Sequence, residues 1–260
     1  MRTYKIIVIA LLLGFTKIAS AQNKHFPTQG TIEFEKRVNM YALIKGMIKK
    51  YPNNDTWYSQ IFEQYQKTNP QFKSLKSTLT FAKEQTLFTP IEAAIPQNNL
   101  FGDYPGVEQK NTIYTNIAAM SSTSQKKIYE ELYLVKDSTR KINWKITNET
   151  RNIAGYDCRR ANALIMDSVY VVAFYTDQIP VSGGPESFTG LPGMILGVAL
   201  PYEHITWFAT KVTELTVADD KLKAPTKGKP QNNAGLLSIL KSALKDWGND
   251  GKDALKGFML

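Results

Sequence analysis

The sequence predicts a mainly β (α+β) protein: a curved antiparallel sheet or half-barrel with a helical insert packed on its concave face and a C-terminal helix. Three observations carry this prediction. From residue 77 onward, short apolar or alternating segments follow one another with brief connections. Such connections join antiparallel neighbours, because parallel pairs need long crossovers. A helical period appears twice, over residues 40–66 and again over 236–247.

The first 21 residues have the pattern of a secretory signal peptide. Arg2 and Lys5 precede an apolar run over residues 6–15, and Ala19-Ser20-Ala21 fits a small-residue cleavage site. The run is short for a membrane span. We therefore expect cleavage near Ala21-Gln22 and a periplasmic or secreted protein. Part of the formal net charge of +9 lies in this segment, and the modest excess that remains does not favour a nucleic-acid partner.

The next segments predict one strand followed by two helices. Residues 31–35 alternate between polar and apolar side chains, as in a half-buried strand. An apolar stripe with helical spacing then runs from Met40 to Tyr51, and a second runs from Trp57 to Tyr65. We expect this insert, residues 40–66, to pack on the sheet. The alternative is that its methionines and aromatic residues line a ligand cavity.

The remaining strands follow in a long series, and a linker and a helix end the chain. The strand over Val169–Tyr175 is apolar on both faces, which predicts a central position. We expect strands at 77–81, 85–89, 111–117, 127–135, 139–147, 155–165, 169–176, 194–199 and 204–212.

Residues 22–217 would then form the β-rich domain, 218–234 a linker, and 235–260 an amphipathic helix with a tail. The 236–247 helix is expected to dock on its own domain. The alternative is peripheral contact with an anionic membrane.

One loop is specified more strongly than any other part of the chain. Between Ile179 and Gly193 there are three prolines and four glycines, which fix a tight backbone path. The residues that define this motif are Gly183, Gly184, Pro185, Gly190, Pro192 and Gly193. We expect a rigid loop that presents a binding surface. The candidate contact residues are Phe188, Leu191, Met194 and Trp207, with Tyr175 in support. The alternative is that the turn only starts a core strand.

The sequence contains no recognisable catalytic, metal-binding or cofactor-binding pattern. The two histidines are His25 and His204, and no nucleophile elbow accompanies them. The single cysteine, Cys158, cannot form an internal disulfide and is expected to be a buried, inert thiol. We therefore expect neither an enzyme nor a cofactor. An enzyme with an unconventional site, built from Asp157, Arg159 and Asp177, is the weaker alternative.

The loop and its upstream flank resemble a known family. Residues 190–196 read Gly-Leu-Pro-Gly-Met-Ile-Leu, and Trp144, Gly155-Tyr156 and Gly184-Pro185 stand at matching places. This pattern resembles the GLPGLI family of secreted proteins from Bacteroidetes, with Met194 where the family name has leucine. The resemblance covers about residues 30–215. It implies a secreted or periplasmic protein without an established activity, often associated with outer-membrane TonB-dependent receptors.

These observations lead to two hypotheses about function. The first is a non-enzymatic protein of the cell envelope that binds an apolar or peptide-like ligand, or that serves as an accessory to an outer-membrane TonB-dependent receptor. The second is a protein-interaction module that holds no small ligand and docks through exposed loops or the 236–247 helix.

Overall fold

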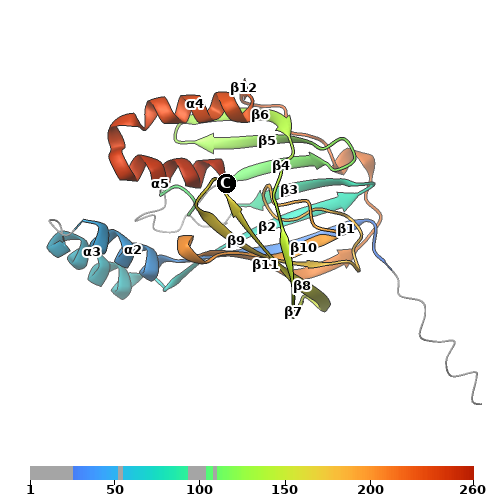
Figure 1. Cartoon of the computed structure of the whole chain (residues 1–260), viewed down its shortest axis with the longest axis horizontal. Helices are drawn as coiled ribbons and strands as arrows, with labels where there is room; N and C mark the ends of the chain where they lie inside the picture. The colour runs from blue at the N-terminus through green and yellow to red at the C-terminus, as the bar shows by residue number, and fades with distance from the viewer. Residues whose placement is uncertain (1–25, 52–54, 93–103, 108–109) are drawn as a thin grey trace, which may run out of the picture.

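Twelve strands form one curved sheet that is open at both edges in the computed structural model (Figure 1). The structure describes residues 26–51, 55–92, 104–107 and 110–260. The expected signal peptide lies outside these residues. The mainly β fold, the curved sheet and a helical C-terminus are confirmed. Within the described residues, no helix has the length and hydropathy of a transmembrane span.

The elements alternate long strands with two pairs of helices. The strands are β1 (Gly30–Asn39), β2 (Phe72–Ala82), β3 (Gln85–Ile91), β4 (Asn111–Asn116), β5 (Ser121–Ile128), β6 (Glu131–Ser138), β7 (Lys145–Ile153), β8 (Tyr156–Ile165), β9 (Val169–Thr176), β10 (Met194–Leu200), β11 (Ile205–Glu214) and β12 (Lys229–Gln231). The helices are α2 (Met40–Lys50), α3 (Asp55–Thr68), α4 (Asn233–Ala243) and α5 (Gly248–Met259), with short 3-10 turns at η3 (Pro201–Glu203), η4 (Asp219–Lys221) and η5 (Lys245–Trp247).

Two antiparallel meanders meet at the first strand. Their order across the sheet is β12-β6-β5-β4-β3-β2-β1-β11-β10-β9-β8-β7. β1 pairs with β2 on one side and with β11 on the other, both antiparallel. Only the three-residue β12 runs parallel to its neighbour, β6, which makes the sheet mixed. β9 lies inside the sheet between β8 and β10, as its two apolar faces predict.

The core fills the inner face of the sheet. Alternation along β1 buries Ile32, Phe34 and Val38 on this face, together with Lys36. The pairing of β1 with β11 shifts between Glu33 and Phe34, and such a bulge bends a strand and increases its twist. The inner face therefore becomes concave, and the side chains that point into it are far from solvent.

The helical insert packs on the main core at one end of the sheet (Figure 1). α2 begins directly where β1 ends, and the Asn39 side chain accepts a hydrogen bond from the Ala42 backbone N–H at 3.1 Å. Because α2 starts at the end of a strand, most of the helix pair lies beyond the ends of β1 and β2 (Figure 1). Met40 and Ile44 still join the main core. The concave face is also covered by the 177–193 loop, whose Glu186 contacts Asn111 on β4, and by α4 and α5, which pack on β5 and β6.

The C-terminal region contains more structure than a linker, one helix and a tail. β12 lies inside the expected linker, and a second helix, α5, follows α4. The chain turns between them at Gly248, whose φ is +56°. The apolar residues of both helices, Leu236, Leu240, Leu244, Ala254 and Phe258, pack on Ile128, Tyr133 and Val135 of β5 and β6. The apolar face of α4 is therefore in contact with the sheet.

Two expected strands have different boundaries. The expected strand over 127–135 is divided by a turn at Tyr129-Glu130 that joins β5 to β6. Tyr129 has a φ of +52°, in the left-handed region. Glycine or asparagine usually occupies such a turn position, and neither is present here. The expected strand over 139–147 begins only at Lys145. Trp144, just before it, donates its indole N–H to the Thr189 carbonyl at 2.9 Å.

Candidate functional site

The 177–193 loop crosses the concave face and is fixed there by backbone contacts. The Ile195 N–H donates to the Gly183 carbonyl at 2.8 Å, and the Met194 N–H donates to the Ile179 carbonyl at 3.0 Å. A Cβ on Gly193, whose φ is +143°, would lie 2.1 Å from the Thr176 carbonyl oxygen. This position therefore requires glycine. The predicted loop is thus joined to β10 by backbone hydrogen bonds, and its rigidity stays a prediction.

The five candidate contact residues of the sequence analysis lie in the core. Tyr175, Phe188, Leu191, Met194 and Trp207 are each at most 2% exposed. The structure brings Phe188 and Trp207 together, with ring centroids 6.2 Å apart. Trp207 also lines a small cavity. A ligand cannot reach the other four from outside in this arrangement, and their role in binding stays a prediction.

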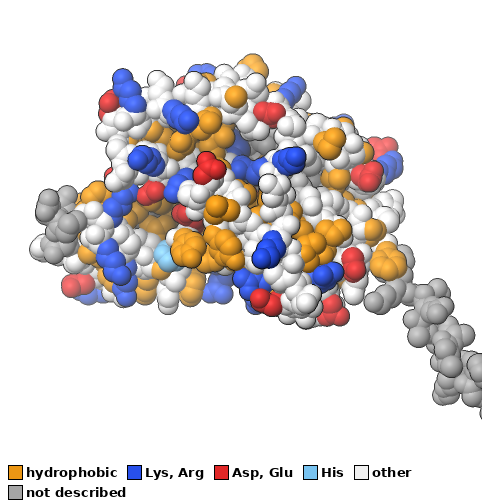
Figure 2. All heavy atoms as spheres, viewed as in Figure 1, with side chains coloured by type: hydrophobic (Ala, Val, Ile, Leu, Met, Phe, Trp, Pro, Cys, Tyr) orange, Lys and Arg blue, Asp and Glu red, His pale blue; other side chains and the backbone are white. Residues whose placement is uncertain are grey.

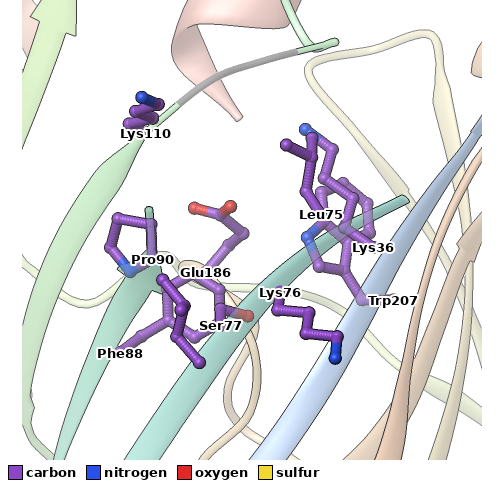
Figure 3. Close-up of a pocket in the computed structure, with 10 residues that line it drawn as sticks. Lys36, Leu75, Lys76, Ser77, Phe88, Pro90, Lys110, Glu186 and Trp207 are labelled. Atoms are coloured by element: carbon purple, nitrogen blue, oxygen red, sulfur yellow. The ribbon is translucent and has the colours of Figure 1, made fainter. Parts of the chain in front are cut away.

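The small cavity, of about 30 Å³, lies on the concave face around Glu186 and is called the Glu186 cavity here (Figure 3). Figure 3 shows the Glu186 carboxylate between Lys110, Pro90 and the Trp207 ring. The Asn111 Nδ2 donates to the Glu186 Oε2 at 3.0 Å. The volume suffices for about one water molecule. The cavity is therefore too small for a drug-sized ligand.

Burial dominates the electrostatics of this cluster. It raises the pKa of Glu186, and nearby Lys36 and the hydrogen bond from Asn111 partly offset the rise. The same burial lowers the pKa of Lys126 to about 8, although Glu186 opposes that change. The Ser77 Oγ and the Trp207 Nε1 are buried on the wall of the cavity and make no hydrogen bond of normal geometry with the described residues. The Trp207 N–H still lies close enough to Glu186 to favour its ionised form.

A much larger depression, of about 610 Å³, lies between α2 and α5 and is called the α2–α5 groove here. Residues of α2, the start of α3, the 104–106 segment, the 202–205 segment and the C-terminal helices line it. Figure 2 shows hydrophobic side chains gathered between these helices, with charged side chains around them. Pockets that bind small ligands have volumes of about 300–1,000 Å³ and mostly apolar walls. The groove therefore has the size and the lining of a binding site.

Aromatic side chains form much of the groove's rim. Trp57 is 58% exposed, Tyr202 77% and Trp247 49%, and all three line the groove. Tyr51 and Tyr58 stack with ring centroids 5.7 Å apart on the same side. Tyrosine and tryptophan are enriched where proteins bind partners, because they combine a large apolar area with a polar group. Exposed aromatic rings gathered at one depression indicate a recognition surface.

Ion pairs connect the two walls of the groove. Lys50 at the end of α2 contacts Asp250 at 2.8 Å and Asp253 at 2.7 Å, both on α5. The Tyr51 hydroxyl also hydrogen bonds to Asp250. Acidic side chains in the first turn of α5 are favourable there because they face the positive end of the helix dipole. These side chains thus bridge the two walls of the groove.

The far end of α5 is anchored to the concave face. The Lys126 Nζ donates to the Phe258 carbonyl at 3.1 Å, Arg140 donates to the Met259 carbonyl, and the Ser187 Oγ donates to the Leu260 carbonyl at 3.1 Å. Cationic side chains are stabilising at the C-terminal end of a helix, where the last carbonyls have no partner within the helix. The wall of the groove that α5 forms is therefore held by the polar residues of the sheet and the loop.

The residues of the unconventional enzyme site do not form a buried cluster. Asp157, Arg159 and Asp177 are all exposed, and Asp157 accepts a hydrogen bond from the Asn152 side chain at 3.2 Å. Cys158 is buried, and burial, with Asp157 adding to the effect, raises its pKa to about 12. Among the described residues, no group of three or more His, Cys, Asp or Glu side chains has a metal-binding arrangement.

The fold and the groove define a class: a mainly β protein with a curved, unclosed sheet and a groove of ligand-binding size at one end. Residues 164–197 match a family model described as "Protein of unknown function (Porph_ging)". This stretch includes the turn at 190–196. No curated protein matches the chain.

Two solved structures are similar in fold. The structure of PNGF-II in a C2 crystal form has a TM-score of 0.50 and 15% identity, with 78% of this chain and 31% of that chain covered. A P21 form of PNGF-II also has a TM-score of 0.50, with 16% identity and coverage of 82% and 33%. The chain thus spans about a third of the length of these proteins, and the likeness concerns the fold alone.

Sequence reasoning missed the α2–α5 groove and, separately, the buried polar cluster around Glu186. The groove combines α2 with α5, and the sequence does not predict α5 because Gly248 or Gly251 is typical of the end of the preceding helix. One signal was available: the Met and aromatic stripe of the 40–66 insert, of which Leu43, Met47 and Tyr51 do line the groove. Glu186 and Lys126 gave no signal, because only the path of the loop brings them together.

Proposed function

We propose that the protein is a non-enzymatic binding protein of the cell envelope that holds an apolar or peptide-like ligand in the α2–α5 groove. The observation that carries this proposal is the groove itself, with a volume of about 610 Å³ and aromatic residues on its rim. The groove also replaces the Pro-Gly turn as the proposed contact surface, because the side chains next to that turn are buried.

The location and the family belong to the same proposal. The basic and apolar start of the chain and its small-residue cleavage site support export to the periplasm or beyond. The match to an uncharacterised family over 164–197 supports membership of the GLPGLI family, since it includes the Gly-Leu-Pro-Gly turn. Association with an outer-membrane TonB-dependent receptor follows from that membership and is part of the proposal.

A non-enzymatic role is supported by the placement of the reactive side chains. The Cys158 thiol is buried and protonated at neutral pH, whereas a nucleophilic cysteine needs an accessible thiolate. His204 sits at the end of η3 with a φ of +58° and lines the groove. The α5 carboxylates that line the same groove, Asp250 and Asp253, are engaged with Lys50. These contacts favour binding over catalysis.

Native mass spectrometry of the protein purified from envelope extract tests the proposal. Met47→Asp places a charge on the apolar wall of the groove, and Lys49→Asp introduces the same side chain on the exposed side of the same helix. We expect a stoichiometric adduct in the wild type and in Lys49→Asp, and its loss in Met47→Asp. A clean apo mass in the wild type under gentle conditions would contradict a tightly held ligand.

A second candidate function is a protein-interaction module that uses the same surface. The exposure of Trp57, Tyr202 and Trp247 favours it, because rigid aromatic side chains at a rim are typical anchors for a protein partner. The same two variants separate the candidates. Recovery of an outer-membrane receptor with the wild type and with Lys49→Asp, but not with Met47→Asp, and with no bound small molecule, would support the interaction module.

A further inference from the structure

Two side chains with complementary chemistry face each other inside the sheet. Asn111 on β4 and Lys126 on β5 are directly paired in the antiparallel register. Both are on the buried face, Asn111 at 1% and Lys126 at 6% exposure. Directly opposed residues on antiparallel strands have Cβ atoms about 4.5–5.5 Å apart. The lysine side chain, with four methylene groups, is long enough to bring its amine to the asparagine carboxamide.

A third side chain completes the arrangement. Glu186, from the 177–193 loop, accepts a hydrogen bond from the Asn111 Nδ2 at 3.0 Å and is itself 6% exposed. This separation is within the range in which a carboxyl group transfers a proton. Since backbone hydrogen bonds fix the loop to β10, the carboxyl is held at the nitrogen atom that would leave if the carboxamide were attacked.

The buried environment shifts each group toward its reactive form. Burial lowers the pKa of Lys126 to about 8 and raises the pKa of Glu186. A neutral amine is the nucleophilic form of lysine, and a protonated carboxyl is the form that can donate a proton. Bulk water has little access to either group.

We propose that Lys126 and Asn111 become joined by an intramolecular isopeptide bond, with Glu186 moving the proton. The Lys126 Nζ lone pair attacks the Cγ of Asn111, and the Nζ–Cγ bond forms. Glu186 gives its proton to Nδ2 as the Cγ–Nδ2 bond breaks, and it takes up a proton from Nζ. The products are an amide between the two side chains and one ammonia molecule, and Glu186 returns to its starting state.

The reaction uses a second rotamer of Lys126. In the structure its Nζ donates to the Phe258 carbonyl at the end of α5, 3.1 Å away. The amine must turn from α5 toward β4 to reach Asn111. After the reaction the new amide keeps one N–H, which can donate to Glu186. The bond would tie β4 to β5 at the end of their pairing farthest from the hairpin turn.

Mass spectrometry of the full chain under denaturing conditions tests this proposal. We expect a mass lower than the sequence mass by one ammonia. Trypsin cuts an unmodified chain after Lys110 and after Lys126, which gives the peptide 111–126. An acylated Lys126 carries no charge and resists trypsin. We therefore expect a peptide 111–127 that is one ammonia lighter and gives no fragment ions from cleavage within the closed loop.

A chain that begins at Gln22 also loses one ammonia when its N-terminal glutamine cyclises. Peptide mapping shows which of the two sites has lost the ammonia. Lys126→Arg and Glu186→Gln should both retain a full-mass peptide over this region. A wild-type peptide 111–126 with its full mass, or an ammonia loss that maps only to the N-terminus, would overturn the proposal. The wild-type result decides the question even if a variant fails to fold.

Discussion

Replacing Gly193 with alanine tests how the 177–193 loop is fixed to the sheet. The residue has a φ of +143°, and an added Cβ would lie 2.1 Å from the Thr176 carbonyl oxygen and 3.1 Å from the Asp177 Cα. Backbone strain at positive φ costs about 1–2 kcal/mol for a residue with a Cβ. Because the obstacles are backbone atoms, β9 or β10 must also move, and overpacking of this kind adds about 1–3 kcal/mol.

Gly155→Ala is the matched control. Gly155 also has a positive φ, +87°, but no atom lies within 4 Å of an added Cβ. The Gly155→Ala variant should therefore show the cost of backbone strain at positive φ without the cost of a clash between the added Cβ and neighbouring atoms. We expect urea unfolding to give a free energy of unfolding for Gly193→Ala that is about 1–3 kcal/mol below that of Gly155→Ala. Equal losses in the two variants would refute the close approach of Gly193 to β9.

Three further predictions, one for a labelling experiment and two for substitutions, test separate parts of the structure. Native Cys158 should resist alkylation at neutral pH and react once urea unfolds the chain, since it is buried and its pKa is about 12; rapid labelling of the folded protein would contradict this. Ser77→Ala should leave the free energy of unfolding unchanged or raise it by up to about 1 kcal/mol, because it removes a buried hydroxyl without a described partner, and a clear loss would indicate that the cavity holds a bound molecule. Asn232→Ala should lower the melting temperature by removing the cap of α4, whose side chain accepts from the Gly235 N–H at 2.7 Å, at a cost of about 1 kcal/mol, and an unchanged transition would argue against that cap.

The sheet could be predicted from the sequence because its signals are local. Alternation identifies β1, and short gaps identify the hairpins, such as the one at Lys83-Glu84. The division of β5 from β6 could not be predicted. Tyr129 adopts a positive φ there, and nothing in its side chain favours that conformation. The tertiary pairing of the two strands imposes the turn.

The site could not be predicted because its parts are distant in the sequence. α5 contains Gly251 and Gly257, which normally weaken a helix. In the structure a Cβ on Gly257 would lie 2.7 Å from Pro105, so the missing side chain allows the helix to pack against that segment. A residue type that weakens an isolated helix thus permits α5 to form the wall of the groove. The contact of Lys50 with Asp250 and Asp253 joins residues about 200 positions apart.

The buried polar cluster illustrates the same limit. Lys126 and Asn111 read as ordinary polar positions on two strands, and Glu186 reads as a loop residue. Only the register of β4 and β5 and the path of the 177–193 loop place them together. Their altered pKa values are consequences of burial, which no local pattern in the sequence reports.

Hydrogen exchange of the protein as purified, compared with the same protein after organic extraction, shows whether a ligand occupies the α2–α5 groove. If the ligand occupies the α2–α5 groove, its removal should speed exchange in residues 40–51 and 248–260 and leave the 177–193 loop unchanged. The extracted molecule, added back, should restore slow exchange in the same two segments. Faster exchange confined to the 177–193 loop would contradict the groove and return the binding surface to the Pro-Gly turn.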